Sequence, residues 1–461
     1  MSSYEFSSLK LSQELVSNIA SLNFKAMTPI QAQALPYLLA NKDVIAQAKT
    51  GSGKTATFGL GILNKLAVKQ FQVQSLVLCP TRELADQVAG EIRRLARGMH
   101  NIKVLNICGG MPFGPQINSL QHGAHIVVGT PGRIEDHIRK GHLQLQQVTT
   151  LVLDEADRML DMGFKEVLYT IIGHLPSKRQ TLLFSATYPS QIEAMATRYL
   201  QQPVTIKVAE VHNQHSIQQQ VYKVTDEESR FDAVRLLLLK QQPQSCLIFC
   251  NTKRETQTLA DQLNAHGFSA AALHGDLEQK QRDQTLARFA NYSMSILVAT
   301  DVAARGLDIT ALDLVINYQI ARELEVHTHR VGRTGRAGAS GLACSLYSQQ
   351  EAYKLELLEN YLGYALPQAK LPPASLLRST PPKPAMVTLQ ISGGKKQKLR
   401  PGDIVGALTG EDGIPGEQIG KIQVGDHWAY VAVAHKFRKQ ALNKLSAGKL
   451  KGRRFKARWL H

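Results

Sequence analysis

A glycine-rich run that ends in a lysine and a hydroxyl residue is the clearest chemical signal in this chain. Residues 48–55 read AKTGSGKT. Two glycines let a backbone curl so that several N–H groups point at one anion. Lys54 is then expected to reach the β- and γ-phosphates of a nucleoside triphosphate, and Thr55 to offer its hydroxyl to Mg²⁺. The expected nucleotide contacts in this loop are Ala48, Lys49, Thr50, Gly51, Ser52, Gly53, Lys54 and Thr55. Ala48 stands where the usual pattern begins with glycine.

A second run, at residues 154–157, places acidic side chains after a β-prone apolar stretch at 149–153. Asp154 is the expected Mg²⁺ partner, and Glu155 is expected to position and deprotonate the attacking water. An acidic cluster after a strand can also be only a helix N-cap, with Asp154 or Asp157 as the capping residue. The phosphate loop upstream favours the catalytic interpretation. Together the two runs predict hydrolysis of a nucleoside triphosphate.

Alternating strand-like and helical stretches surround both runs. Residues 43–48 read as a strand and 56–66 as a helix, on either side of the phosphate loop. The alternation extends from about residue 28 to 208 and predicts a parallel sheet covered by helices. Residues 209–219 are polar and read as a connector. A second α/β pattern follows and ends near residue 366.

The second α/β pattern lacks a phosphate loop but contains HRVGRTGR at residues 329–336. Arg333 and Arg336 are three residues apart, so they are expected to share one face of a helix or turn. Two guanidinium groups on one face suit a phosphoryl group in transfer. If they belong to a separate domain, they reach the γ-phosphate only when the two domains close. A solvated basic helix start is an equally good interpretation of this run alone.

Basic charge is concentrated at the C-terminal end of the chain. The formal net charge is +17 over 461 residues, and residues 385–461 hold 15 lysines and arginines against 5 acidic residues, a net of +10. This composition predicts a nucleic-acid-binding module. Residues 367–384 are proline-rich and predict a semi-rigid, extended linker. After the linker, the order β-α-β-β-α-β is that of an RNA-recognition-motif (RRM) domain.

The remaining composition bounds the class of protein. The chain has no apolar run long enough for a transmembrane helix, and its first residues lack the pattern of a secretory signal. Five cysteines have neither zinc nor redox spacing, so buried structural thiols are expected. These features predict a cytoplasmic protein.

From about residue 4 to 366 the motifs resemble those of the DEAD-box RNA helicases, superfamily 2 ATPases with two RecA-like domains. The resemblance implies an α/β fold of two tandem RecA-like domains, residues 1–208 and 220–366, with parallel sheets flanked by helices. It also implies that Phe24 stacks on adenine, that Gln31 bonds its edge, and that Asp308 lies near the ribose. Asn23 stands where the family usually has glycine.

The same resemblance implies that Arg333 and Arg336 are arginine fingers and that residues 185–187 couple hydrolysis to unwinding. It implies RNA contacts at Thr81, Arg82, Gly110, Thr130, Gly132, Arg133, Arg282 and Thr300. Backbone amides, hydroxyls and guanidinium groups of these kinds can grip phosphates and 2′-hydroxyls without reading bases. We therefore expect a helicase core with little sequence preference.

Residues 385–461 are expected to form a small α+β, RRM-like domain. Its RNA contacts are expected in two basic runs, 395–400 and 449–454, at Lys395, Lys396, Arg400 and Lys451. Trp428 and Tyr430 occupy aromatic positions of the third-strand signature, but Asp426 and His427 replace its basic-glycine start. Core packing and RNA stacking are equally good interpretations of these two rings.

This tail, joined to this core, resembles a bacterial branch of the family. The resemblance implies a tail that binds a hairpin of large-subunit ribosomal RNA (rRNA) on pre-50S particles. The leading hypothesis is a monomeric, RNA-stimulated ATPase that separates short rRNA duplexes during assembly of the 50S subunit, with ATP and Mg²⁺ as cofactors. One alternative is a DNA helicase or translocase, which Thr81, Thr130 and the tail disfavour. Another is an ATP-locked RNA clamp without unwinding, which the complete set of hydrolytic residues disfavours.

Overall fold

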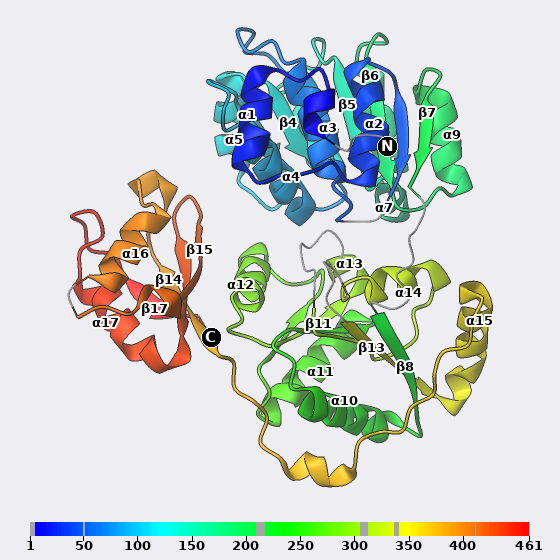
Figure 1. Cartoon of the computed structure of the whole chain (residues 1–461), viewed down its shortest axis with the longest axis vertical. Coiled ribbons are helices and arrows are strands. Elements are labelled where there is room, and N and C mark those ends of the chain that lie inside the picture. Colours follow the sequence, from blue (N-terminus) through cyan, green and yellow to red (C-terminus); the bar gives the residue numbers. More distant parts are fainter. Residues whose placement is uncertain are drawn as a thin grey trace. The chain divides into compact units, whose positions relative to one another are not determined.

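The computed structural model describes residues 5–48, 51–208, 217–304, 312–335, 341–410 and 412–460. The chain divides into two compact units, one with the described residues up to 208 and the other with those from 217 onward (Figure 1). Within the described ranges, no helix is both long and apolar enough to cross a membrane.

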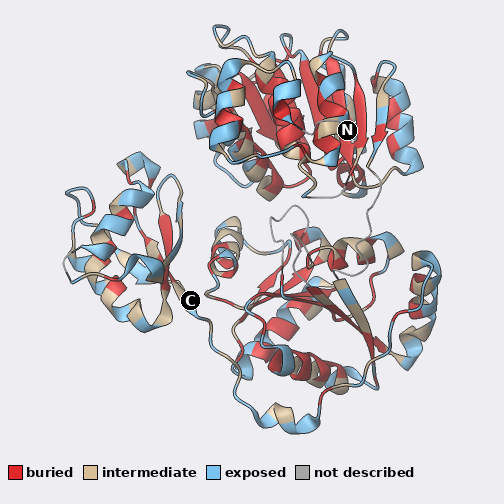
Figure 2. Ribbon diagram, viewed as in Figure 1, coloured by how far each residue is buried: buried red, intermediate tan, exposed pale blue. Residues whose placement is uncertain are grey.

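The first unit is built on a sheet of seven parallel strands, counted among the described residues, in the order β3-β4-β2-β5-β6-β1-β7. Its central strands are short apolar runs buried on both faces (Figure 2), as expected of a parallel sheet covered by helices. The strands are β1 Val44–Gln47, β2 Ser75–Leu78, β3 Val104–Ile107, β4 Ile126–Gly129, β5 Thr150–Asp154, β6 Gln180–Ser185 and β7 Val204–Lys207.

Helices cover both faces of this sheet. Alternate residues of β1 show the two faces, since Val44 and Ala46 pack with α1 to α4 whereas Ile45 packs with α5 to α9. The helices are α1 Gln13–Ser21, α2 Pro29–Leu39, α3 Lys54–Asn64, α4 Arg82–Leu95, α5 Phe113–Gln121, α6 Pro131–Arg139, α7 Ala156–Asp161, α8 Lys165–Gly173 and α9 Ser190–Tyr199.

The second unit contains a parallel sheet of six described strands in the order β10-β11-β9-β12-β13-β8. Helices α10 and α11 pack on one face, and α15 packs on the other. Strand β8 begins at Ile217, so residues 217–219 of the expected connector lie in a strand. The strands are β8 Ile217–Val224, β9 Cys246–Cys250, β10 Ala270–Leu273, β11 Ile296–Thr300, β12 Leu314–Asn317 and β13 Gly341–Ser348. The helices are α10 Glu227–Gln241, α11 Lys253–Ala265, α12 Gln279–Ala290, α13 Asp301–Ala304, α14 Leu324–Val331 and α15 Ala352–Leu362.

The first half of the proline-rich segment, which the sequence predicts to be an extended linker, is bound to this sheet through a parallel bridge between Gln368 and Val221. The N–H of Val221 donates to the carbonyl of Pro367 (3.0 Å), and the N–H of Ala369 donates to the carbonyl of Val221 (2.9 Å). Ala369 and Leu371 then pack on the core, and a short 3-10 helix, Ala374–Arg378, lies against α10. Apolar residues between the prolines supply this contact.

The C-terminal domain contains a four-stranded antiparallel sheet, counted among the described residues, in the order β15-β16-β14-β17. Its elements are β14 Met386–Ile391, α16 Pro401–Thr409, β15 Ile419–Val424, β16 Ala429–Ala434, α17 Arg438–Ala447 and β17 Ala457–Trp459. The predicted order β-α-β-β-α-β is confirmed. With the two parallel sheets, it confirms the predicted fold class.

Candidate functional site

The expected nucleotide and RNA residues occupy two halves of one edge of the first sheet. In the first unit, the phosphate loop follows β1, the acidic run begins at the end of β5, and the expected coupling residues 185–187 begin at the end of β6. The expected RNA residues Thr81, Gly110 and Thr130 follow β2, β3 and β4. In the sheet, β5-β6-β1 are consecutive neighbours and so are β3-β4-β2. Because all of these strands are parallel, their carboxyl ends lie at the same edge, where open α/β sheets bind ligands.

The phosphate loop lies directly against the side chain of Gln31. Gly51 and Gly53 have left-handed φ values of 82° and 97°. A Cβ atom at Gly53 would lie 2.8 Å from Nε2 of Gln31 and 2.9 Å from Oγ1 of Thr28, so only glycine fits there. Lys54 is buried, and one of its three N–H groups donates to the carbonyl of Ala48 at 2.8 Å. Lys49 and Thr50 lie outside the described residues.

The acidic pair is buried at the end of β5. Asp154 is 3% exposed, and burial raises the pKa of its carboxyl to about 7, although Lys54 acts in the opposite direction. Glu155 has a left-handed φ of 50° and occupies the N-cap position of α7 without a side-chain capping bond. The N-cap position therefore belongs to neither Asp154 nor Asp157, although their carboxylates accept from the N–H groups of Glu155 (3.1 Å) and Arg158 (3.0 Å) at the start of the helix. The strained backbone of Glu155 is typical of functional positions.

Asp157 ties the acidic run to the end of β6. Its carboxylate accepts hydrogen bonds from the N–H (2.9 Å) and the hydroxyl (2.8 Å) of Thr187. Its own N–H donates to the hydroxyl of Ser185 at 3.4 Å. The residues expected to couple hydrolysis to unwinding are therefore bonded to the acidic run.

The expected adenine site combines an oriented amide with a half-buried ring. Oε1 of Gln31 accepts from the N–H of Thr28 (2.8 Å), and its Nε2 donates to the carbonyl of Gly53 (3.4 Å). An amide keeps one further lone pair and one further N–H, which match the edge of adenine. The guanidinium of Arg94 lies 5.2 Å from the ring centre of Phe24. Asn23 has φ 58°, a left-handed conformation that asparagine tolerates in place of glycine.

Magnesium fits the residues present only together with a nucleotide. The protein oxygens expected to bind it are the Thr55 hydroxyl and the Asp154 carboxylate, hard donors of the kind that Mg²⁺ prefers. Among the described residues, no group of three or more His, Cys, Asp or Glu side chains could hold a metal by itself. Mg²⁺ usually completes its coordination with substrate phosphates and water.

Met111 joins the expected RNA contacts of the first unit. Its sulfur lies 3.0 Å from Nη2 of Arg82, and its carbonyl accepts from Nη1 of Arg133 at 2.9 Å. Gly110, which precedes it, has a left-handed φ of 72°. Three segments that are distant in sequence therefore converge at this half of the edge.

Two threonines and a glycine in this half lie at helix N-termini. Thr81 and Thr130 are the N-cap residues of α4 and α6, and the Thr81 hydroxyl accepts from the N–H of Leu84 at 3.3 Å. Gly132 lies in the first turn of α6, where a Cβ atom would meet nothing within 4 Å. Helix N-termini present unpaired N–H groups, which suit phosphates.

In the second unit, two expected RNA contacts meet at the end of β11. Thr300 is 8% exposed, and its hydroxyl accepts from the N–H of Ala303 at 3.4 Å. Nη2 of Arg282, on α12, donates to the carbonyl of Ala303 at 3.2 Å. Asp308 lies outside the described residues.

A buried arginine holds the segment that carries the expected arginine finger. Arg330 is 1% exposed and donates from Nε and Nη2 to the two carboxylate oxygens of Asp301, at 2.6 and 2.7 Å. It also donates to Oδ1 of Asn251 (2.9 Å) and to the carbonyl of Gln319 (2.8 Å). Arg333 follows in the turn after α14, which ends at Val331, so it is not on a helix. Arg336 lies outside the described residues.

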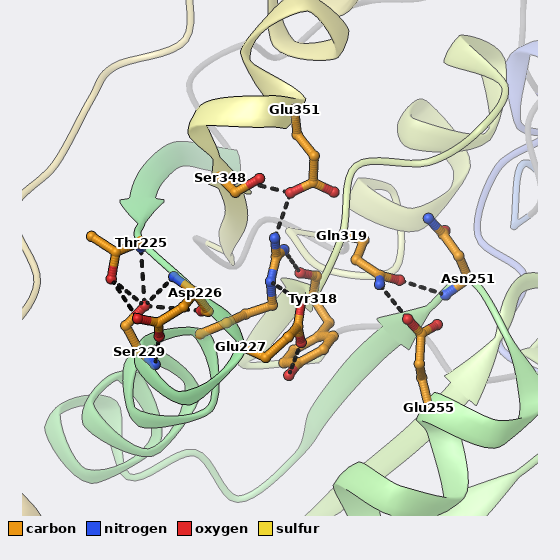
Figure 3. A network of polar contacts seen from close by, with 11 residues as sticks. Thr225, Asp226, Glu227, Ser229, Asn251, Glu255, Tyr318, Gln319, Ser348 and Glu351 are labelled. Atoms are coloured by element: carbon orange, nitrogen blue, oxygen red, sulfur yellow. Dashed lines mark hydrogen bonds and ion pairs between the residues drawn. The ribbon is translucent and has the colours of Figure 1, made fainter.

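Figure 3 shows further polar contacts of the second unit, around Gln319 and Tyr318. Gln319 accepts from the N–H of Asn251 (3.2 Å) and donates to Glu255 (2.5 Å). Arg230 donates to the carbonyl of Tyr318 (2.6 Å) and to Glu351. Sequence reasoning quoted Arg330 only as part of a motif and missed Asn251 and Asp301 as its partners. Their proximity to Arg330 had no signal in the sequence.

The two basic runs of the C-terminal domain adjoin each other. Nζ of Lys451 donates to the carbonyl of Lys398 at 3.3 Å. We call the exposed side chains Lys395, Lys396, Arg400 and Lys451 the C-terminal basic surface. Trp428 and Tyr430 stack on each other with ring centres 4.2 Å apart, and Tyr430 is 2% exposed. For Tyr430 the structure favours packing over RNA stacking.

Three protein families match this chain: DEAD/DEAH box helicase at residues 28–195, helicase conserved C-terminal domain at 228–338, and DbpA RNA binding domain at 388–458. The chain is 52% identical to the ATP-dependent RNA helicase DbpA of Escherichia coli, covering 96% of this chain and 97% of that protein. It is 45% identical to the helicase CshA of Geobacillus kaustophilus, covering 80% and 78%. A solved structure of Saccharomyces cerevisiae Dbp5, bound to RNA and ADP BeF3, is similar at a TM-score of 0.73, with 31% identity, covering 79% of this chain and 95% of that one.

Proposed function

Because the chain belongs to the DEAD-box family of ATP-dependent RNA helicases, we propose that it separates short rRNA duplexes during assembly of the 50S ribosomal subunit. The observation that carries this proposal is the edge of the first sheet, where residues that suit a nucleotide adjoin residues that suit an RNA backbone. The two halves meet where β2 pairs with β5. In this proposal, hydrolysis and RNA binding share one sheet.

The nucleotide half supplies groups for hydrolysis of ATP. Thr55 and Asp154 would hold the magnesium ion, which would neutralise negative charge on the phosphates. Lys54 binds the β- and γ-phosphates. Glu155 takes a proton from the attacking water as the bond between the γ-phosphorus and the leaving ADP oxygen breaks.

The second unit is proposed to make this hydrolysis conditional. Arg333 and Arg336 would stabilise the charge on the transferring phosphoryl group once the two units close. RNA contacts on both units, such as Arg133 and Thr300, would favour closure when RNA is bound. Because these contacts grip the backbone, the core would act on many sequences.

The C-terminal basic surface is proposed to choose the RNA. A tether raises the local concentration of nearby duplexes, so specificity can reside in the tail while the core stays unspecific. The match to the DbpA RNA binding domain supports an RNA ligand for the tail. Large-subunit rRNA on pre-50S particles is the proposed ligand. We propose that the protein acts as a monomer in the cytoplasm, where its five free, buried thiols would stay reduced.

RNA-stimulated ATPase activity of the full chain tests this proposal. Fragments of large-subunit rRNA should stimulate turnover at lower concentration than unrelated RNA of equal length. Triple replacement of Lys395, Lys396 and Lys451 by glutamate should abolish that preference and lower the slope of log affinity against log salt by about one per lost phosphate contact. The matched control replaces Lys421, Lys436 and Lys439 by glutamate, because these three exposed lysines lie outside the C-terminal basic surface. Equal stimulation of the unaltered chain by rRNA and unrelated RNA would refute the tether.

A further inference from the structure

The guanidinium of Arg133 is held on one side and open on the other. Its Nη1 donates to Oε1 of Gln116 at 2.7 Å and to the carbonyl of Met111 at 2.9 Å. Its carbon Cζ lies 5.0 Å from the ring centre of Phe113. Among the described residues, Nη2 and Nε of Arg133 make no hydrogen bond. These two atoms present N–H groups in the fork that matches a phosphate.

Gln116 is fixed in one orientation by three partners. It lies on α5, is 6% exposed, and donates from Nε2 to the carbonyl of Cys108 at 2.9 Å. Its Oε1 accepts from Arg133 and from Nε2 of His137, at 3.0 Å. If the amide were rotated by 180°, its NH₂ group would point at the N–H donors of Arg133 and His137, and its oxygen would point at the carbonyl oxygen of Cys108. The partners therefore determine the orientation, and both lone pairs of Oε1 are used.

His137 completes the support without adding charge. Its ring is fully buried and stacks on Phe113 with ring centres 4.1 Å apart. Burial, followed by the neighbouring His142 and Arg133, lowers the pKa of His137 to about 4. The ring is therefore neutral near pH 7 and donates its Nε2–H to Gln116. The neutral His137 ring therefore adds no positive charge beside Arg133 where both side chains donate to Oε1 of Gln116.

We infer that Gln116 is a positioning residue for RNA: it orients the Arg133 guanidinium so that Nη2 and Nε face a backbone phosphate. This inference rests on the proposed role of Arg133 in RNA binding. The contacts of Nη1 leave the N–H groups of Nη2 and Nε available on the opposite side of the guanidinium. An arginine that is already ordered also loses less side-chain entropy when it binds. Gln116 itself touches no RNA.

Gln116→Met tests the inference, because methionine has similar volume but no amide. A hydrogen bond to a charged group is lost, so the RNA concentration for half-maximal ATPase stimulation should rise about tenfold. The Michaelis constant for ATP and the RNA-independent ATPase rate should not change. Gln121→Met, at an exposed position of the same helix, is the matched control. Gln116→Asn keeps an amide but shortens it, and serves if the methionine variant is too unstable to fold.

A double-mutant cycle with Arg133→Ala separates positioning from a general structural effect. If Gln116 acts through Arg133, its replacement should cause no further loss of RNA affinity in the Arg133→Ala background. Additive losses, or unchanged RNA affinity in both Gln116 variants, would overturn the inference while leaving Arg133 as an RNA contact. If Arg133→Ala alone leaves RNA affinity unchanged, the proposed role of Arg133 fails and the inference fails with it.

Discussion

Glu155 lies where the chain turns from β5 into α7, in a backbone conformation that costs free energy and that no capping bond explains. If it is the general base, Glu155→Gln should retain ATP and RNA binding but lower turnover by a factor of about 10² to 10⁴. ATPase rates at saturating RNA, together with nucleotide binding measured separately, check this expectation. Glu166→Gln, at an exposed position on α8, is the control. Near-normal turnover of the Glu155 variant would remove it from the mechanism.

At the scale of residues, the sequence predicted side chains that follow a recognisable local pattern. Gly53 and Lys54 belong to one short loop, and their chemistry is legible from types and spacing alone. The sequence did not predict the structural roles of Gln116 and Arg330, because these roles depend on partners that are distant in sequence. Cys108 is such a partner for Gln116, and Asn251 for Arg330. Such partners become neighbours only when the sheet is assembled.

At the scale of elements, one buried ion pair joins α10 to the start of α15. Arg230 is 3% exposed and donates to the carboxylate of Glu351. Burial alone would raise the pKa of Glu351, but the hydrogen bonds from Arg230 and Ser348 outweigh it and hold the pKa below 4.5. The carboxylate therefore stabilises the fold above pH 4.5, and this contribution is lost as the pH falls through the lowered pKa.

Glu351→Gln should accordingly lower the free energy of unfolding by about 2 kcal/mol at pH 7, because the buried guanidinium loses a charged hydrogen-bond partner and keeps only the exposed Glu227 as counter-charge, 3.3 Å from its Nε. The difference from the unaltered chain should shrink as the pH falls below 4.5. Urea unfolding monitored at several pH values measures both effects. Glu356→Gln, at an exposed position on α15, should change little. A difference that does not depend on pH would contradict the ionic role of Glu351.

Element order was predictable because apolar periodicity and turn residues are local. The ends of elements and the packing of the connecting segments were less predictable. The order of elements predicted a final strand but not its length; β17 spans only Ala457–Trp459, since its length depends on the pairing offered by β14. The proline-rich segment was expected to be an extended linker, and its packing on the second sheet through the partly buried Ala369 and Leu371 was not predicted. Tertiary contacts decided both outcomes.

At the scale of the whole molecule, the proposed ATPase is divided between two units. The first unit holds Lys54, Asp154 and Glu155. The second holds Arg333, whose segment is anchored by the buried bonds of Arg330 to Asp301. An arginine that arrives only on closure would make turnover depend on RNA that bridges the units. The sequence could suggest this division from the missing second phosphate loop, but the anchoring of Arg333 required the structure.

Arg333→Ala tests the division. An arginine finger acts on charge that develops during phosphoryl transfer, so its removal should lower kcat at saturating RNA by a factor of about 10³ or more. The Michaelis constant for ATP should change much less, because most of the expected ground-state contacts with ATP belong to the first unit. Arg254→Ala, at an exposed position on α11, controls for loss of a positive charge from the second unit. A raised Michaelis constant with unchanged kcat would mean that Arg333 binds the nucleotide and does not act in the transfer step, and the closure model would then fail.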